Sequence, residues 1–101
     1  MKKCIIIANG KSPTNRVIEY FYKKGFNTII CADGGANSAK KLGIVPDFII
    51  GDLDSAETKT LKFFQGKSKI IQIRRQNDTN VEKCLKFAIG KGFKEVILLG
   101  V

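Results

Sequence analysis

Residues 27–43 read NTIICADGGANSAKKLG, and this stretch decides the fold class. Its first part, residues 27–32, is a short isoleucine-rich segment that predicts a strand. Gly34 and Gly35 end that segment, and residues 36–42 are typical of a short helix that ends at Gly43. A strand followed at once by a helix is the repeating unit of a parallel α/β sheet.

The same unit recurs on both sides of this stretch. The continuous apolar run at residues 3–8 (KCIIIA) predicts a strand that is buried on both faces. Further strands are predicted at residues 47–50, 68–73 and 95–99, with a helical segment before each. The alternation predicts an α/β domain with a Rossmann-like parallel sheet of about five strands and helices on both faces, a three-layer αβα arrangement.

Three helix starts can be predicted from local patterns. Ser12 followed by Pro13 is typical of an N-cap and a first helical residue. Residues 54–57 (DSAE) have the spacing of a helix start, so Asp54 is an N-cap candidate. Thr79 and Glu82 have capping-box spacing, ahead of apolar residues at helical intervals through positions 81–89.

Length and composition exclude several classes of protein. The chain has 101 residues, enough for one domain at most. No apolar run approaches the roughly 20 residues of a membrane span, and the segment after the first lysines is too short for a signal peptide. Cys4, Cys31 and Cys84 form no CxxC pair, which predicts buried, reduced thiols and a cytoplasmic protein. Histidine is absent, so catalysis and metal ligation by histidine are excluded.

The charge distribution points to an anionic ligand and away from nucleic acid. The net charge is +9, from 18 basic and 9 acidic residues. The lysines are dispersed singly or in pairs, without a basic cluster or aromatic platform that would bind nucleic acid. Four aspartates, at positions 33, 47, 52 and 54, lie close together in the sequence. An acidic centre in a basic protein predicts a metal site that serves an anionic ligand.

Polar residues concentrate after the predicted strands, where open parallel sheets bind their ligands. They are Asn9 and Gly10 after the first strand, Asp33, Gly34, Gly35 and Asn37 after the second, Asp52, Asp54 and Ser55 after the third, and Gln76, Thr79 and Asn80 after the fourth. Glycines let backbone amides approach phosphate closely. Asp52 and Asp54 are two residues apart, so in an extended segment both carboxylates would point the same way and could hold Mg²⁺.

Several neighbouring residues have structural explanations that the sequence leaves open. Asp78 and Thr79 could serve only the capping box. Arg74 and Arg75 could reach phosphates or simply face solvent. Asp47 is expected at the start of its strand, on the opposite edge of the sheet, in a structural role.

Two familiar phosphate-binding motifs are absent. Gly10, Lys11 and Ser12 resemble the end of a P-loop, but that motif needs glycine at position 5, which is Ile5. No GxGxxG follows the first strand, so a dinucleotide site of the usual Rossmann type is not expected.

Three segments together resemble the successive motifs of thiamine pyrophosphokinases. They are residues 31–37 (CADGGAN), 46–55 (PDFIIGDLDS) and 76–85 (QNDTNVEKCL), and the likeness covers essentially the whole chain. The resemblance implies a reaction in which the hydroxyl of thiamine attacks the β-phosphorus of ATP, giving thiamine diphosphate and AMP. It also implies Mg²⁺ as the cofactor.

The resemblance also implies roles for individual residues. Asp52 and Asp54 would ligate Mg²⁺ and act in catalysis, with Asp33 beside the metal and the phosphates. The nucleotide pocket would be shaped by Gly34, Gly35 and Asn37, with further contacts from Asn9, Gly10, Ser55, Gln76 and Thr79.

The sequence departs from the family in two respects. Asn80 stands where the family usually has an aspartate that serves as metal ligand or base, and asparagine cannot accept a proton. The family also carries a β-rich thiamine-binding domain after this one, and usually forms homodimers. We therefore expect residues 1–101 to be the ATP-binding, catalytic α/β domain of a longer enzyme.

Three alternatives remain open from the sequence. The same chemistry could act on another alcohol, such as a hydroxymethylpterin. Asn80 motivates a second alternative, a non-catalytic nucleotide-binding or regulatory module. The net charge motivates a third, a nucleic-acid-binding domain, which the dispersed lysines disfavour.

Overall fold

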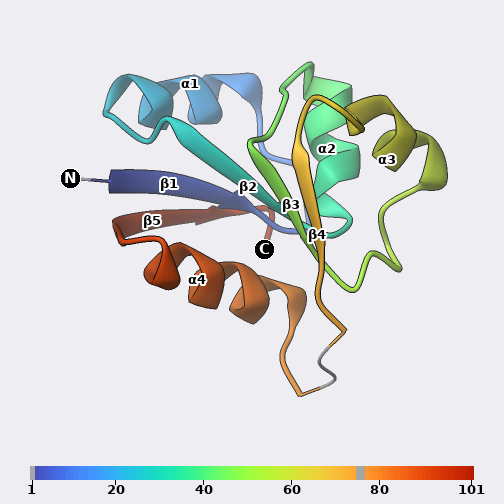
Figure 1. Ribbon diagram of the computed structural model, residues 1–101. Helices are drawn as coiled ribbons and strands as arrows, with labels where there is room; N and C mark the ends of the chain where they lie inside the picture. The colour runs from blue at the N-terminus through green and yellow to red at the C-terminus, as the bar shows by residue number, and fades with distance from the viewer. Residues whose placement is uncertain (1, 75–76) are drawn as a thin grey trace.

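A computed structural model describes residues 2–74 and 77–101 (Figure 1). Strands and helices alternate along the chain in the order β1 (Lys2–Ile7), α1 (Asn15–Lys23), β2 (Thr28–Ala32), α2 (Gly35–Leu42), β3 (Phe48–Gly51), α3 (Thr58–Phe64), β4 (Lys69–Gln72), α4 (Asn80–Gly90) and β5 (Phe93–Leu99).

The strands form one parallel sheet in the order β4-β3-β2-β1-β5. Helices α1, α2 and α3 cover one face of the sheet and α4 covers the other (Figure 1). The three-layer αβα arrangement predicted from the alternating pattern is therefore confirmed. All the strands point the same way, so the segments that follow them meet at one edge of the sheet, here called the carboxyl edge.

The core has two parts, one on each face of the sheet, because successive side chains of a strand point to opposite faces. On one face Ile5 and Ile7 pack with residues of three helices, among them Ile18, Ala36, Ala39 and Phe64. On the other face Cys4 and Ile6 pack with Cys84 and Ala88 of α4. The apolar run of β1 is thus continuous because both of its faces are buried.

Two predicted helix starts are wrong. Helix α1 is capped by Thr14, whose hydroxyl accepts from the Val17 amide at 3.3 Å, so Ser12 and Pro13 precede the helix. Helix α3 starts at Thr58 after Glu57, so Asp54 is not its N-cap. The segment before α3 is held in another conformation by hydrogen bonds from a neighbouring strand end, which are described below.

The three cysteines are buried and free, as expected. Burial raises the pKa of the Cys4 thiol to about 11 and that of Cys84 to about 12, and it also raises the pKa of Cys31. Within the described ranges, no helix is long and apolar enough to cross a membrane.

These thiols should be unreactive in the folded protein, because the thiolate is the nucleophile and burial disfavours it. At about pH 8 we expect an aromatic disulfide reagent to modify the native chain at least about 100-fold more slowly than the denatured chain. The absorbance of the released aromatic thiolate measures this rate. Equal rates in the two states would contradict the burial of all three side chains.

Candidate active site at the carboxyl edge of the sheet

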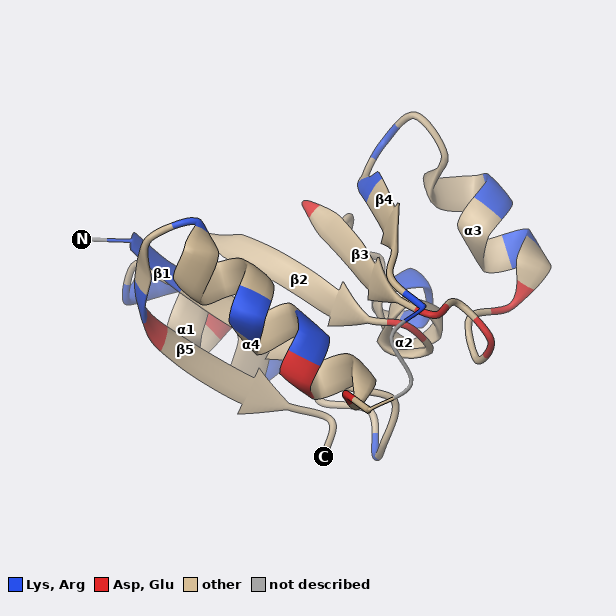
Figure 2. Cartoon of the chain, turned by 60° about the horizontal axis from the view of Figure 1, so that its bottom comes forward, with Lys and Arg blue, Asp and Glu red and all other residues tan. Residues whose placement is uncertain are grey.

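Acidic residues follow the tips of β2 and β3, at the carboxyl edge (Figure 2). Asp33 directly follows β2, Asp52 directly follows β3, and Asn80 is the first residue of α4. Hydrogen bonds join these three residues in one network, so the structure brings together three side chains that the sequence predicted for the site.

Asp33 lies at the centre of the network and is fully buried. One carboxylate oxygen accepts from the Ala56 amide at 2.8 Å, and the Ser55 amide approaches both oxygens at 3.1 and 3.2 Å. The backbone of Asp33 has φ +46°, a conformation that aspartate tolerates better than most residues. Because Asp33 holds the amides of residues 55 and 56, the loop after β3 closes over the strand ends and α3 can begin only later.

Asn80 links Asp33 to the segment that follows β3. Its Nδ2 donates to Asp33 at 3.2 Å, and its Oδ1 accepts from the Asp52 amide at 3.1 Å. Gly51 makes this approach possible: a Cβ there would lie 2.6 Å from Asn80 Oδ1, on a backbone with φ +150°. The amide of Asn80 uses its donor and its acceptor on two different strand ends, a task that a carboxylate could not perform.

The segment between Asp52 and Asp54 is a turn and not an extended strand. Leu53 has φ +66°, and the Asp54 amide donates to a carboxylate oxygen of Asp52 at 3.2 Å. The sequence prediction that Asp52 and Asp54 lie in an extended segment, with both carboxylates pointing the same way, is therefore wrong. Asp52 is also held through its carbonyl, which accepts from Gln72 at 3.2 Å.

Asp33 and Asp52 influence each other's ionisation. The pKa of Asp33 is raised, first by burial and then by its hydrogen bond to the Asp52 side chain. The same hydrogen bond is the largest cause that lowers the pKa of Asp52, followed by the Asp54 amide. Of the two carboxyl groups, Asp52 therefore keeps its charge down to the lower pH.

The donor set fits a magnesium ion that is shared with a phosphate. Within residues 2–74 and 77–101, no three acidic or cysteine side chains are gathered so as to hold a metal by themselves. Mg²⁺ usually binds through one or two carboxylates and completes its shell with water and phosphate oxygens. Asp52, a carboxylate with a lowered pKa at the edge of the sheet, is suited to such a partial shell.

The Asn37 side chain forms two hydrogen bonds with the loop after β3. Its Nδ2 donates to the Ser55 carbonyl at 3.1 Å, and its Oδ1 accepts from the Glu57 amide at 3.0 Å. Both ends of its amide are thus engaged within the protein. The role in a nucleotide pocket predicted for Asn37 and Ser55 remains a prediction, beside this structural one.

The glycines after β1 and β2 permit close packing. A Cβ on Gly34 would collide with the Asn9 side chain, and one on Gly35 would collide with the Ile7 carbonyl. The Gly10 amide donates to the Gly100 carbonyl at 2.6 Å. Helix α2 therefore starts against the end of β1, and the nucleotide contacts predicted for these residues remain predictions.

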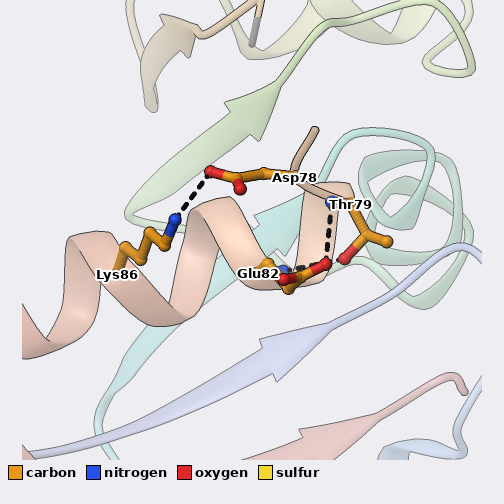
Figure 3. A network of polar contacts seen from close by, with 4 residues as sticks. All are labelled: Asp78, Thr79, Glu82 and Lys86. Atoms are coloured by element: carbon orange, nitrogen blue, oxygen red, sulfur yellow. Dashed lines mark hydrogen bonds and ion pairs between the residues drawn. The ribbon is translucent and has the colours of Figure 1, made fainter. Parts of the chain in front are cut away.

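Helix α4 begins with the predicted capping box, which is confirmed (Figure 3). The Thr79 hydroxyl accepts from the Glu82 amide at 3.1 Å, and Glu82 accepts from the Thr79 amide at 3.1 Å. Asp78 pairs with Lys86, eight residues further along the chain, at 3.0 Å. These contacts fix the first turn of α4, and with it the position of Asn80.

Replacing Thr79 with alanine removes the acceptor for the Glu82 amide. We expect the free energy of unfolding to fall by about 1 kcal/mol and the melting temperature by about 4–8 °C. Thr79→Ser, which keeps the hydroxyl, is the matched control and should lie close to the parent. Equal melting temperatures for Thr79→Ala and Thr79→Ser would show that the cap contributes nothing.

The remaining arginine, glutamine and aspartate predictions have different outcomes. Arg74 is exposed, whereas Arg75 and Gln76 lie outside the described residues. Asp47 lies on the opposite edge and accepts from the Ile29 amide at 2.8 Å, as its structural assignment predicted.

Sequence reasoning missed Lys83 of α4, a lysine only 2% exposed. Its position three residues after Asn80, on the same face of the helix, was the signal available.

A hollow of about 600 Å³ lies at the amino ends of the strands, away from this network. Four lysines line it, including Lys2 and Lys3. The ammonium of Lys2 donates to the Lys91 carbonyl at 2.9 Å, and that of Lys3 donates to the Lys24 carbonyl at 3.3 Å. Both carbonyls belong to the C-caps of α4 and α1, so these lysines have a structural role in capping helix ends.

The fold and the network define the class of protein: a parallel α/β domain with a carboxylate and amide site at its carboxyl edge. Residues 20–101 match the family described as "Thiamin pyrophosphokinase, catalytic domain". The chain belongs to the thiamin pyrophosphokinase family. Its sequence is 32% identical over 91 residues to the thiamine pyrophosphokinase of Saccharomyces cerevisiae, covering 80% of this chain and 28% of that protein.

Solved structures of the family have the same fold. The crystal structure of yeast thiamin pyrophosphokinase superposes with a TM-score of 0.71 at 30% identity, over 85% of this chain and 30% of that one. That of Bacillus subtilis thiamine pyrophosphokinase has a TM-score of 0.78 at 19% identity, over 99% of this chain and 47% of that one. The chain thus spans less than half the length of each of these relatives.

Proposed function

We propose that this chain is the ATP-binding part of an enzyme that transfers diphosphate from Mg·ATP to the hydroxyl of thiamine, giving thiamine diphosphate and AMP. The observation that carries the proposal is the network of Asp33, Asn80 and Asp52 at the carboxyl edge, in a chain of this family. In the transfer, the thiamine oxygen bonds to the β-phosphorus of ATP. The bond from that phosphorus to the oxygen shared with the α-phosphate breaks, so AMP leaves, and the proton of the thiamine hydroxyl is released to water.

Different residues of this chain would position the metal ion and the phosphates of ATP. Asp52, with Asp54 two residues further on, would hold Mg²⁺, which when bound neutralises charge on the phosphates. Asp33 would act mainly through the protein, because the amides of the loop and of Asn80 already occupy its carboxylate. The N-terminus of α4 and the glycines after β2 lie at the same edge, where helix ends and backbone amides favour anions.

A second candidate function is a nucleotide-binding module without catalysis, and Asn80 is the observation that favours it. Its amide is engaged with Asp33 and the Asp52 backbone and cannot accept a proton from an attacking hydroxyl. Such a module would bind Mg·ATP and release no AMP, even together with the rest of a longer protein.

Further proposals concern the setting of this domain. We infer that thiamine is recognised mainly by a β-rich domain outside these residues, in line with the share of the yeast relative that the chain covers, 28%. We also infer that the whole enzyme is a homodimer. We also propose that it works in the cytoplasm and binds no nucleic acid. The free, buried cysteines support the first of these and the dispersed lysines the second.

Release of AMP from ATP tests the proposed reaction. Mg·ATP is incubated with the chain, alone and with thiamine or a hydroxymethylpterin, and AMP is separated by ion-exchange chromatography. AMP that appears only with thiamine supports the proposal, and AMP that appears only with the pterin assigns a different alcohol. Binding of ATP without AMP in any mixture would favour the non-catalytic module, provided that the longer protein behaves in the same way.

A further inference from the structure

One buried charge in α4 has no role in the network described above. Lys83 is 2% exposed, as deeply buried as the core side chains. Among the described residues, no carboxylate lies within ion-pair distance of its ammonium, and the ammonium donates no hydrogen bond. Burying an ammonium group without a partner is costly, so the position of this side chain requires an explanation.

Both the aliphatic stem and the ammonium of Lys83 are almost wholly covered, because the whole residue is only 2% exposed. Every described side-chain nitrogen or oxygen that is fully enclosed has a hydrogen-bond partner. The Lys83 ammonium has none, so it is not completely enclosed and a small part of it remains accessible to a ligand. A lysine of this kind presents its charge at the end of a fixed stem, in one place.

That place is on the side of α4 that faces the carboxyl edge. Lys83 lies three residues after Asn80, so the two side chains share one face of the helix. Asn80 contacts Asp33 and the amide of Asp52. The next residue, Cys84, lies 3.9 Å from the carbonyl of Ile50 near the end of β3. This part of α4 is therefore packed directly over the strand ends that carry the acidic residues.

The charge of Lys83 acts on Asp52 at the same site. It is one of the causes that lower the pKa of Asp52, after the hydrogen bonds from Asp33 and the Asp54 amide. The ammonium and the carboxylate are thus within electrostatic reach, yet they form no ion pair. Two opposite charges that face one site without touching match a ligand with both signs of charge, as a phosphate with its metal ion has.

We propose that Lys83 binds a phosphoryl oxygen of the nucleotide whose metal ion Asp52 would hold. The inference rests on the proposed function, since the ligand is the polyphosphate of Mg·ATP. The lysine ammonium is a compact charge that suits a phosphate oxygen without demanding a planar partner. Binding would also give the ammonium the anionic partner that the described part of the chain does not provide.

The test compares affinities for Mg·ATP, measured by titration calorimetry, in variants of the full chain. Lys83→Met keeps the apolar stem and removes the charge, and we expect it to weaken binding about 10- to 100-fold. Lys83→Arg should recover most of the affinity. Lys94→Met removes the same charge from an exposed position of β5 and should change affinity by less than about threefold.

A second readout separates ligand binding from a purely structural role. Without ligand, Lys83→Met should melt at the same temperature as the parent or higher, because an unpaired buried charge is replaced by an apolar group. A structural lysine would instead lower the melting temperature. Loss of affinity without loss of stability is the expected combination.

The outcomes distinguish this inference from the proposed function. If the parent binds Mg·ATP and Lys83→Met binds it as tightly as Lys94→Met does, the inference is wrong and the proposed function stands. If the parent does not bind Mg·ATP, both are wrong. If Lys83→Met does not fold, the lysine side-chain NMR signal that Lys83→Arg removes is followed in the parent: Mg·ATP must shift it, and an unmoved signal overturns the inference.

Discussion

Asp33→Ala is expected to lower the free energy of unfolding by about 3 kcal/mol or more, a large share of the stability of a small domain. The carboxylate of Asp33 is fully buried and accepts from the amides of Ser55, Ala56 and Asn80. Alanine would leave these donors without an acceptor, and a buried unsatisfied donor costs about 1–3 kcal/mol. Urea denaturation followed by circular dichroism measures the change.

Asp47→Ala is the matched control for this experiment. The Asp47 carboxylate also accepts from the backbone, but among the described residues only the Ile29 amide donates to it, at 2.8 Å, on the opposite edge of the sheet. We expect a loss of about 1 kcal/mol there. Equal losses in the two variants would contradict the central structural role assigned to Asp33.

Asn80→Asp is expected to make the stability of the domain depend on Mg²⁺. In the parent, the Asn80 amide donates to Asp33 at 3.2 Å. Aspartate would replace this donor with a second carboxylate, so a hydrogen bond would be lost and two like charges would meet. Without metal we expect a loss of about 2 kcal/mol. Mg²⁺ should restore most of it, because a bound cation stabilises the folded state and offsets the repulsion.

Melting curves with and without Mg²⁺ test this expectation. Asn77→Asp is the control, since it adds the same charge to the exposed loop before α4. The rise in melting temperature on adding Mg²⁺ should be largest for Asn80→Asp. If all three proteins respond equally to Mg²⁺, the side chain at position 80 does not face the metal site. If Asn80→Asp also increases AMP release, the catalytic function gains over the non-catalytic module.

The fold could be predicted from the sequence because its signals are local. The apolar run of β1 is continuous since both faces of that strand are buried, and glycines mark most of the turns. The residues at the carboxyl edge could be predicted for the same reason: once the strands are parallel, Asp33 and Asp52 must both lie at that edge. That their strands are neighbours came from the structure.

What could not be predicted depends on contacts between distant segments. The start of α3 is delayed because Asp33, some twenty positions earlier, holds the amides of Ser55 and Ala56. The alternation of side chains assumes an extended strand, so it could not predict the turn at Leu53, where φ is positive. Lys83 is charged, and nothing in the local sequence indicates burial. Its burial results from the packing of α4 on the sheet and is seen only in the folded chain.

The central claim is that Asp52 and its neighbours at the carboxyl edge form a Mg·ATP site. Phosphorus NMR of ATP tests it most directly, with Mg²⁺ present and with the parent chain and Asp52→Asn compared under the same conditions. We predict that the ATP resonances shift and broaden with the parent and remain close to their free positions with Asp52→Asn. Resonances that are unaffected by the parent, or equally affected by both proteins, would contradict the claim.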